Sequence, residues 1–404
     1  MARRVLVVGA GIGGDALAVC LGRAGWEVVV AEIAADLRSG GQTVDLRGPS
    51  AEVLDRLGLL EECRRRLVPQ RGIAWVDARG RRLAEMGVEA FDGQGFVSRD
   101  ELLRTDLADV LHAAVGPGVE HRFSETVDRL EHLPDGVRVT FRSGAVETFD
   151  LVVGTDGTHS RVRALTFGPE DRFLVPLGLA HAWFTLDEQP GTPALDGWFL
   201  VHNAPGARAV EARPGHPGQQ EIGFSFTTGD AGLPDRRDRD AQDALLRRTF
   251  AGVGWRAAEL VDALGRAQDF ALDTVDQIHL DRWHDGRVVL LGDSAWCASP
   301  LSGLGTALAL VGAHVLSELL VTGEAAGKPL ADTLARYERV LRPRTSAAQR
   351  LLPGRVRSVL PRTQLGIRAA TTVYRLVQTR PAAALLGRLA AGSGHDPGLP
   401  SLAA

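Results

Sequence analysis

Residues 5–32 read VLVVGAGIGGDALAVCLGRAGWEVVVAE. An apolar run at 5–8 leads into the glycine-rich segment GAGIGG at 9–14, and a second apolar run at 28–30 ends close to Glu32. Between the two runs, apolar residues recur at helical spacing from Leu17 to Ala24, and Gly25 follows. This pattern predicts a strand, a helix and a second strand, which is how a doubly wound α/β domain begins.

The glycine spacing in this context predicts dinucleotide binding. Gly9 would make the tight turn, Gly11 would let the pyrophosphate approach the backbone, and Gly14 would allow close packing of the helix. Glu32, about 20 residues further on, is placed to hold a ribose diol. The motif alone does not distinguish FAD from NAD. The residues expected at the cofactor from this segment are Gly9, Gly11, Ile12, Gly13, Gly14 and Glu32.

A second strand-loop-helix unit follows near residues 287–315. The apolar run 288–291 ends in Gly292-Asp293, and a loop containing Gly303 and Gly305 precedes an apolar helix. Free N–H groups at the start of that helix favour negative charge, and Asp293 can accept hydrogen bonds from ligand hydroxyls. A structural βα turn with a capping aspartate explains the same stretch equally well.

Three further segments are candidates for the same crevice. A hairpin within 126–153 leads into GTDGTHSRVR at 154–163, a third apolar strand that ends in glycine and aspartate. The pair Gly40-Gly41 permits close approach of the backbone to a ligand, or forms a plain turn. Arg99 precedes a helix predicted to be capped by Ser98, and pairs either with phosphate or with a neighbouring carboxylate.

Composition bounds the class of protein. The chain has 404 residues, above the roughly 250–300 at which one core stops growing, so more than one domain is expected. A net charge of −4 gives no reason to expect nucleic acid. The odd number of cysteines, three, without ligand spacing predicts reduced thiols and no metal site. Residues 1–8 lead straight into a strand, and we expect a cytoplasmic protein.

Four motifs in this order resemble the single-component FAD-dependent monooxygenases of the para-hydroxybenzoate hydroxylase type. They are GAGIGG with Glu32, Arg99 before a leucine-rich helix, GTDGTHSRVR at 154–163, and GDSAWCASPLSGLG at 292–305. The likeness covers roughly residues 1–345. It is closer to the branch that contains tetracycline-inactivating and antibiotic-tailoring enzymes.

The resemblance implies an α/β fold with a Rossmann-like FAD-binding domain, a β-sheet substrate domain and C-terminal helices. We expect these at 1–168 with 283–335, at 169–282 and at 336–404. It implies non-covalent FAD and NAD(P)H as co-substrate. It also implies that one oxygen atom of O₂ is inserted into an aromatic or polyketide-like molecule through a flavin 4a-hydroperoxide. The cofactor contacts that it adds are Gly41, Arg99, Asp156, Gly292, Asp293, Pro300, Gly303, Leu304 and Gly305.

Two positions depart from the pattern of that family. Ile33 follows the ribose acid where arginine is frequent, and Trp296 stands where the motif usually carries a histidine. An adenosine or phosphate contact is therefore expected to be absent, and Trp296 reads equally well as a core residue.

Extended apolar segments within 179–228 predict an antiparallel sheet above the flavin, and residues 238–265 read as helical. Candidate substrate contacts there are His181, Trp198 and Phe224, although such residues are more often ordinary core. From 339 to 394 the chain has eleven arginines and no acid. C-terminal helices packed across both domains are the favoured reading, and a basic segment on an anionic membrane is the alternative.

Other flavoprotein classes fit less well. Flavin halogenases need a lysine in the first domain, whereas Lys328 is the only lysine, and disulfide reductases need paired cysteines. A flavin-dependent reductase of C=C bonds and a non-catalytic flavin-binding protein stay open. The residues indicate neither the substrate, nor NADH against NADPH, nor the oligomeric state.

Overall fold

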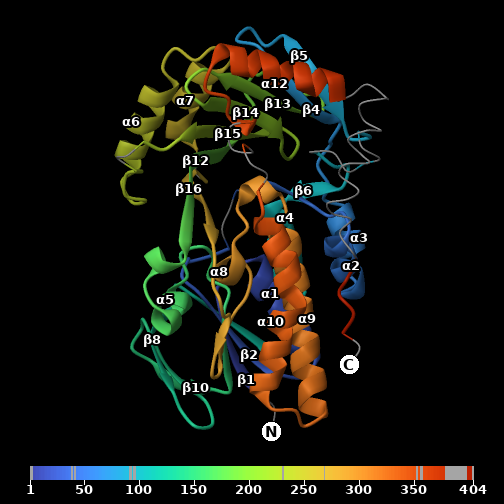
Figure 1. The fold of residues 1–404 in the computed structure, drawn as a ribbon, viewed down its shortest axis with the longest axis vertical. Helices are drawn as coiled ribbons and strands as arrows, with labels where there is room; N and C mark the ends of the chain where they lie inside the picture. The colour runs from blue at the N-terminus through green and yellow to red at the C-terminus, as the bar shows by residue number, and fades with distance from the viewer. Residues whose placement is uncertain are drawn as a thin grey trace.

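The structure is a computed structural model. It describes residues 3–37, 40, 42–90, 93, 97–229, 232–267, 269–351, 354, 358–377 and 398–402. Gly41, one of the expected cofactor contacts, lies outside these residues. Figure 1 shows two layered parts, one built on a mostly parallel sheet and the other on a large antiparallel sheet with helix α12 across it.

The first part is organised on a six-stranded sheet in the order β17, β18, β11, β1, β2, β7. Its strands are β1 (Arg4–Val8), β2 (Glu27–Glu32), β7 (Val119–Phe123), β11 (Leu151–Gly154), β17 (His284–Asp285) and β18 (Val288–Leu290). Every neighbouring pair is parallel except β17 with β18. The carboxyl ends of β1, β2, β11 and β18 therefore share one edge, as the apolar runs predicted.

Helices cover this sheet and bury its apolar residues in one core. They are α1 (Ile12–Arg23), α2 (Pro49–Arg56), α3 (Leu60–Arg64), α4 (Arg104–Ala113), α5 (Arg161–Phe167), α8 (Asp293–Trp296), α9 (Gly305–Ala325) and α10 (Leu330–Gln349). Among the described helices, α9 alone is long and apolar enough to cross a membrane by length and composition. It packs against α1, α2 and α10, which accounts for its apolar surface (Figure 1).

Smaller elements complete this part. The predicted hairpin near 126–153 is a three-stranded meander of β8 (Val127–His132), β9 (Val137–Phe141) and β10 (Val146–Phe149). Two short strands, β3 (Thr43–Asp45) and β6 (Glu101–Leu103), pair with each other, and the 3₁₀ turns η1 (Glu170–Arg172) and η3 (Pro300–Ser302) also belong here. A further 3₁₀ turn, η2 (Leu264–Arg266), belongs to the second part.

The second part is a seven-stranded sheet in the order β16, β12, β15, β14, β13, β4, β5. Its strands are β4 (Gly72–Val76), β5 (Arg82–Gly87), β12 (Leu174–Asp187), β13 (Trp198–Ala204), β14 (Arg208–Pro214), β15 (Gln219–Thr227) and β16 (Ala271–Ile278). The predicted antiparallel sheet is present. However, β4 and β5 come from the segment 1–168 that we assigned to the cofactor domain, and β4 joins β13 in parallel.

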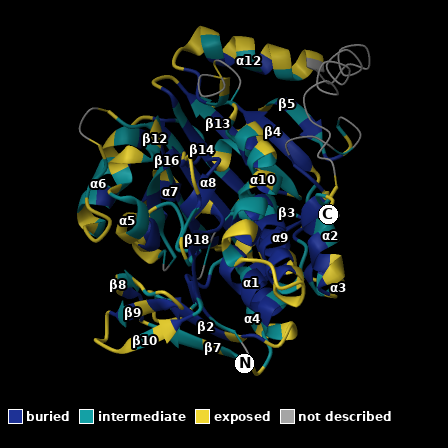
Figure 2. Cartoon of the chain, turned by 60° about the horizontal axis from the view of Figure 1, so that its bottom comes forward, coloured by how far each residue is buried: buried dark blue, intermediate teal, exposed yellow. Residues whose placement is uncertain are grey.

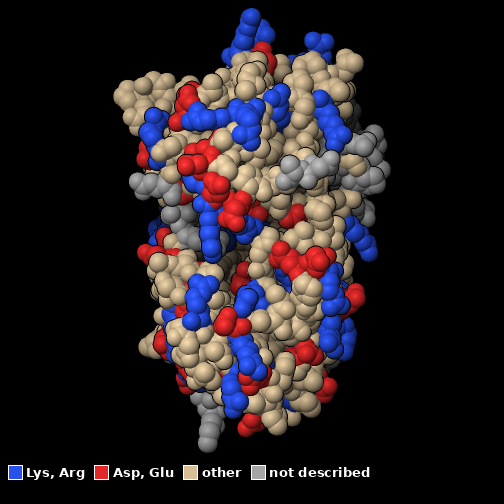
Figure 3. Space-filling view, turned by 90° about the vertical axis from the view of Figure 1, so that its left-hand side faces the viewer, with Lys and Arg blue, Asp and Glu red and all other residues tan. Residues whose placement is uncertain are grey.

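Helices α6 (Arg239–Phe250) and α7 (Ala257–Ala263) pack their apolar residues against one face of this sheet. Helix α12 (Gln364–Val377) contacts β5 and β13, and its outer side is exposed (Figure 2). Because α10 packs on the cofactor part and α12 on the second sheet, the described C-terminal helices span both parts. Figure 3 shows basic and acidic side chains interspersed on one face.

Helices α2 and α3 are separated at Gly58, which takes a positive φ of 68°. One local prediction was wrong. Ser98 does not cap α4: its hydroxyl accepts from the N–H of Asp100 in a turn, the strand β6 follows, and α4 begins only at Arg104. A three-residue strand is too short to show in the sequence pattern.

Candidate functional site

The GAGIGG turn is shaped by close contacts on three of its glycines and by open space at the fourth. Gly9 has φ 110°, and a Cβ on it would lie 2.7 Å from the Thr155 carbonyl oxygen. A Cβ on Gly14 would lie 2.0 Å from the Gly9 carbonyl oxygen, and one on Gly13 would lie 2.7 Å from Leu291. A Cβ on Gly11 would meet nothing within 4 Å. Gly11 therefore faces a space that the fold leaves free beside the start of α1, where Ile12 follows.

Glu32 closes the neighbouring side of this space. One carboxylate oxygen accepts the N–H of Ala10 at 2.8 Å, and the other accepts the N–H of Ala34 at 2.8 Å. These two bonds hold the carboxylate at the tip of β2 beside the glycine turn. The position suits an acceptor for sugar hydroxyls.

Asp156 makes hydrogen bonds within its own segment. Its carboxylate accepts from the Ser160 hydroxyl and from the N–H of Val162, at the start of α5. Burial raises the pKa of this carboxyl, and these hydrogen bonds act against the rise. Asp156 thus positions the DG segment by capping α5, while the backbone at 155–156 packs against Gly9.

The loop after β18 contains a strained residue that the sequence reasoning missed. Gly292 and Gly303 take φ values of 72° and 68°, as glycine allows, but Ser299 also has φ 72°. The Ser299 side chain is buried, and its hydroxyl has no hydrogen-bond partner. A strained backbone with an orphaned polar group beside a predicted site indicates a position built for a ligand. No sequence signal marks it, because serine gives no warning of positive φ.

The rest of the loop presents backbone and an exposed leucine. Pro300 begins η3, Gly303 ends it, and Gly305 is the first residue of α9. Leu304, directly before α9, is 41% exposed. The first N–H groups of α9 lack partners within their own helix and favour an electron-rich ligand there.

In the structure, Arg99 forms an ion pair at the surface of the protein. Its guanidinium pairs with Glu89, and both side chains are more than 70% exposed. The arginine beside the crevice is Arg104, the first residue of α4, whose charge acts on Asp293. The pKa of the Asp293 carboxyl is raised, because surrounding protein atoms desolvate it, and the positive charge of Arg104 opposes this rise. Part of the residue is nevertheless exposed to solvent. In the sequence, Arg104 could have been singled out by its position directly before the buried residues of α4.

A cavity lies between this loop and the second sheet. Pro300 and Leu301 form one wall, and side chains from β12, β14 and β15 form the opposite wall. Apolar and aromatic side chains fill the remaining sides, and those lining the cavity include Ile73, Trp75, Phe199, Val201, Val359, Leu360 and Tyr374. Tyr374 of α12 stacks on Trp75 with 3.9 Å between ring centroids. The C-terminal helix is therefore part of the cavity wall.

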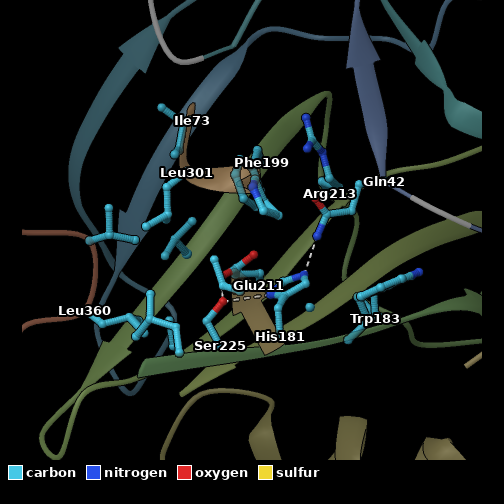
Figure 4. Close-up of a pocket in the computed structure, with 18 of the residues that line it drawn as sticks. Gln42, Ile73, His181, Trp183, Phe199, Glu211, Arg213, Ser225, Leu301 and Leu360 are labelled. Atoms are coloured by element: carbon cyan, nitrogen blue, oxygen red, sulfur yellow. Dashed lines mark hydrogen bonds between the residues drawn. The ribbon is translucent and has the colours of Figure 1, made fainter. Parts of the chain in front are cut away.

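The polar end of the cavity is a hydrogen-bonded chain (Figure 4). The amide of Gln42 contacts His181 Nε2, His181 Nδ1 lies 2.8 Å from the Ser225 hydroxyl, and this hydroxyl donates to Glu211 at 2.8 Å. Because the single Ser225 proton is directed to the carboxylate, its oxygen accepts from His181 Nδ1–H. His181 Nε2 then carries the lone pair that accepts from Gln42. Burial lowers the pKa of His181, which agrees with a neutral ring.

Two ionisable residues, Arg213 and Glu221, flank these hydrogen-bonded residues. Arg213 donates to Glu101 at 2.5 Å, while its buried Nε has no partner. Burial raises the pKa of Glu221 to about 7, and the Thr185 hydroxyl lies 3.0 Å from its carboxyl. Thr185 also contacts the carboxylate of Asp269, so its one proton cannot serve both acids. A protonated Glu221 that donates to Thr185 resolves this conflict.

Of the three predicted substrate contacts, only His181 lines the cavity. Phe224 is fully buried on the other face of the sheet, where it contacts Phe184 and Phe250. Trp198 lies at Arg82, with 4.7 Å between the guanidinium and the ring, outside the cavity lining. Trp296 is core, packed against Trp283 with 4.5 Å between ring centroids.

This arrangement defines a class: a nucleotide crevice at the carboxyl edge of a doubly wound sheet, whose last loop contributes to the wall of a cavity lined by aromatic and apolar residues. The residues fit FAD on their own geometry, through the open face of Gly11, the fixed acceptor Glu32 and the orphaned hydroxyl of Ser299.

Comparison with known proteins gives the family. A family model described as "FAD binding domain" matches residues 2–351, and the chain belongs to this family of FAD-dependent monooxygenases. An uncharacterized protein of Mycobacterium tuberculosis is 40% identical over 324 residues, which are 80% of this chain and 86% of that protein. The FAD-dependent monooxygenase asL4 of Sarocladium schorii is 32% identical, covering 93% and 92% of the two chains. The crystal structure of the tetracycline destructase Tet(51) superposes with a TM-score of 0.76 at 28% identity, covering 93% and 97%.

Proposed function

We propose that this protein is a monooxygenase that uses FAD, NAD(P)H and O₂ to insert one oxygen atom into an aromatic or polyketide-like small molecule. One observation carries the proposal. Pro300 and Leu301, from the loop that the family motif assigns to the flavin, line the same cavity as the hydrogen-bonded residues Gln42, His181, Ser225 and Glu211.

The cavity suits a flat, partly polar substrate. Its apolar sides include Trp75, Phe199 and the stacked Tyr374, which favour an aromatic or conjugated ring. Its polar end offers the Nε2 lone pair of His181 and the unpartnered Nε–H of Arg213. A substrate with a hydroxyl and a neighbouring carbonyl or carboxylate would satisfy both groups.

The chain's own residues would position the substrate and take up a proton. A substrate hydroxyl that displaces the Gln42 amide can donate to His181 Nε2, while Nδ1 stays bonded to Ser225. Withdrawing this proton makes the ring more electron-rich, which favours attack on an electrophilic oxygen. When bound, FAD supplies the redox chemistry by accepting hydride from NAD(P)H and activating O₂. The apolar walls would keep water from the reacting atoms once substrate and cofactor fill the cavity.

The names of two relatives support the proposal. The tetracycline destructase is named for its action on tetracycline, and asL4 is named an FAD-dependent monooxygenase. A cytoplasmic location follows from the same proposal, because NAD(P)H must be supplied as a soluble co-substrate.

The test is a screen of phenolic and polyketide compounds for substrate-stimulated NAD(P)H oxidation, followed by turnover under ¹⁸O₂. The proposal expects one labelled oxygen atom in the product, detected by mass spectrometry. Product that forms without O₂ would instead identify a reductase of C=C bonds. An FAD-loaded protein that oxidises no NAD(P)H with any compound would identify a non-catalytic flavin-binding protein.

A further inference from the structure

Three side chains with metal-ligand chemistry meet outside the cofactor crevice and the cavity. Asp15 lies in the first turn of α1, His112 in the last turn of α4, and His121 in the middle of β7. One ligand atom from each lies within 4.8 Å of the others. Asp15 Oδ1 is 2.9 Å from His121 Nε2, and Asp15 Oδ2 is 3.4 Å from His112 Nδ1.

Asp15 is an unusual residue for its place. Its neighbours Gly14 and Ala16 are buried, and Asp15 itself is fully buried. Burying an ionised carboxylate costs on the order of several kcal/mol of stability unless the carboxylate is ion-paired or bound to a metal. The ion-pair partners that the structure gives it are the two imidazoles.

Two atoms of the cluster face each other without a hydrogen bond. Asp15 Oδ2 and His112 Nδ1 are both buried, and neither has a hydrogen-bond partner. Because both can present a lone pair, an ion between them would satisfy both at once. The His112 and His121 rings, 4.4 Å apart between centroids and nearly perpendicular, direct their nitrogens toward the same carboxylate.

The ligand set selects the kind of ion. Two imidazoles and one carboxylate suit zinc and its neighbours, whereas magnesium and calcium prefer oxygen ligands alone. At metal–ligand distances of about 2 Å, ligand atoms on one ion lie roughly 3–4 Å apart, which the two measured separations approach. The His112 side chain is 31% exposed, so the cluster lies close to the surface, from which an ion could enter.

We propose that Asp15, His112 and His121 form a binding site for a divalent transition-metal ion of the zinc type. The cysteine spacing led us to expect no metal site. The three residues of this cluster are separated by as many as 106 positions, so no short sequence motif marks them. The ion would join α1, α4 and β7 directly after the glycine motif, which ends at Gly14. This inference does not depend on the proposed monooxygenase reaction.

The test uses the FAD-loaded full chain without a histidine tag, stripped with a chelator. Co²⁺ serves as the probe, because its visible absorption reports on nitrogen and oxygen ligands, and elemental analysis after Zn²⁺ loading gives the stoichiometry. We expect one equivalent of metal and a higher unfolding temperature in Zn²⁺ than in chelator. Asp15→Asn and His112→Gln should each weaken binding by about tenfold or more.

His132→Gln is the matched control, because it removes an imidazole that lies 3.8 Å from a carboxylate elsewhere, that of Asp285. It should bind metal like the wild type. His112 is partly exposed, so His112→Gln keeps the test valid if Asp15→Asn does not fold. Absence of a Co²⁺ spectrum in the wild type, or equal affinity in all four proteins, would overturn the proposal.

Discussion

His181 Nδ1 lies 2.8 Å from the hydroxyl oxygen of Ser225, whose proton is directed to Glu211. This contact sets the tautomer of His181, because Ser225 can only accept from it. The nitrogen left with a lone pair, Nε2, faces Gln42 and the cavity. One hydrogen bond across two neighbouring strands thus decides which atom of the histidine is available to a substrate.

Replacing this histidine tests its role. His181→Gln should lower kcat/KM for any substrate found in the screen by about a hundredfold, because the proton acceptor is lost. Reduction of FAD by NAD(P)H in the absence of substrate should stay near the wild-type rate. Stopped-flow spectroscopy of the two half-reactions separates these effects.

Ser225→Ala should produce a smaller loss and shift the pH dependence of kcat/KM, since Nδ1 would no longer be held as the donor. Trp198→Phe is the control, because Trp198 lies outside the cavity lining. Equal kcat/KM in the wild type and His181→Gln would show that the polar end does not take part in the reaction.

The open face of Gly11 gives a prediction about FAD. A methyl group there meets no protein atom within 4 Å, so Gly11→Ala should fold with an unfolding temperature of the apoprotein close to the wild type. The methyl would occupy the space proposed for the pyrophosphate, and FAD affinity should fall by about tenfold or more, or 1.4 kcal/mol. Fluorescence titration of the apoprotein with FAD measures this change.

Gly116→Ala is its control, because a Cβ there also meets nothing within 4 Å and the residue precedes β7. The two variants should be equally stable and differ only in FAD affinity. Retention of wild-type affinity by Gly11→Ala would mean that the cofactor does not approach this glycine.

Glu221 gives a prediction about pH. Its pKa of about 7 in the folded protein exceeds its ordinary 4.5, so the folded state keeps the proton over this interval while the unfolded state releases it. The contribution of Glu221 to stability therefore declines as pH rises from about 4.5 to 7, by up to about 3 kcal/mol. Glu221→Gln should be more stable than the wild type at pH 8 and nearly equal at pH 5.

Urea unfolding at several pH values checks this difference, and subtracting the variant from the wild type removes the titration of other groups. Glu85→Gln, which replaces a carboxylate 43% exposed on β5, should show no such pH-dependent gap. A constant gap for Glu221→Gln between pH 5 and 8 would contradict the raised pKa.

The packing of Trp296 gives a prediction about stability. A Cβ on Gly312 of α9 would lie 3.0 Å from the Trp296 ring, which is itself enclosed by Trp283 and Tyr337. Gly312→Ala should therefore cost about 1–3 kcal/mol in the free energy of unfolding. Gly265→Ala, where a Cβ meets nothing within 4 Å, should cost little. Equal stability of the two variants would show that the ring can shift.

The sequence predicted the parts of the fold that depend on local periodicity. The strand-helix-strand unit at 5–32 and the antiparallel strands within 179–228 are present because burial imposes a regular spacing on their apolar residues. The assignment of β4 to the second sheet was out of reach, because a parallel pairing with β13 depends on contacts more than a hundred residues apart.

The site was predictable where a residue's role follows from backbone shape, as at Gly9 and Gly14. It was not predictable where a three-dimensional neighbour decides the role, as for Arg104 beside Asp293. Strand alternation could have corrected one error. His181 pairs with Ser225, and Phe224 pairs with Ala182, the next position on β12, so the two predicted contacts face opposite sides of the sheet.

The stack of Tyr374 on Trp75 places helix α12 in the cavity wall, while the glycine turn and Glu32 lie in segments far from this helix in sequence. Helix α12 can therefore be exchanged or lengthened without altering the cofactor-binding segments. Selection for a new substrate could act on this helix as an interchangeable module, and a chimaera carrying the corresponding helix of a relative is the direct way to redesign which molecules the cavity accepts.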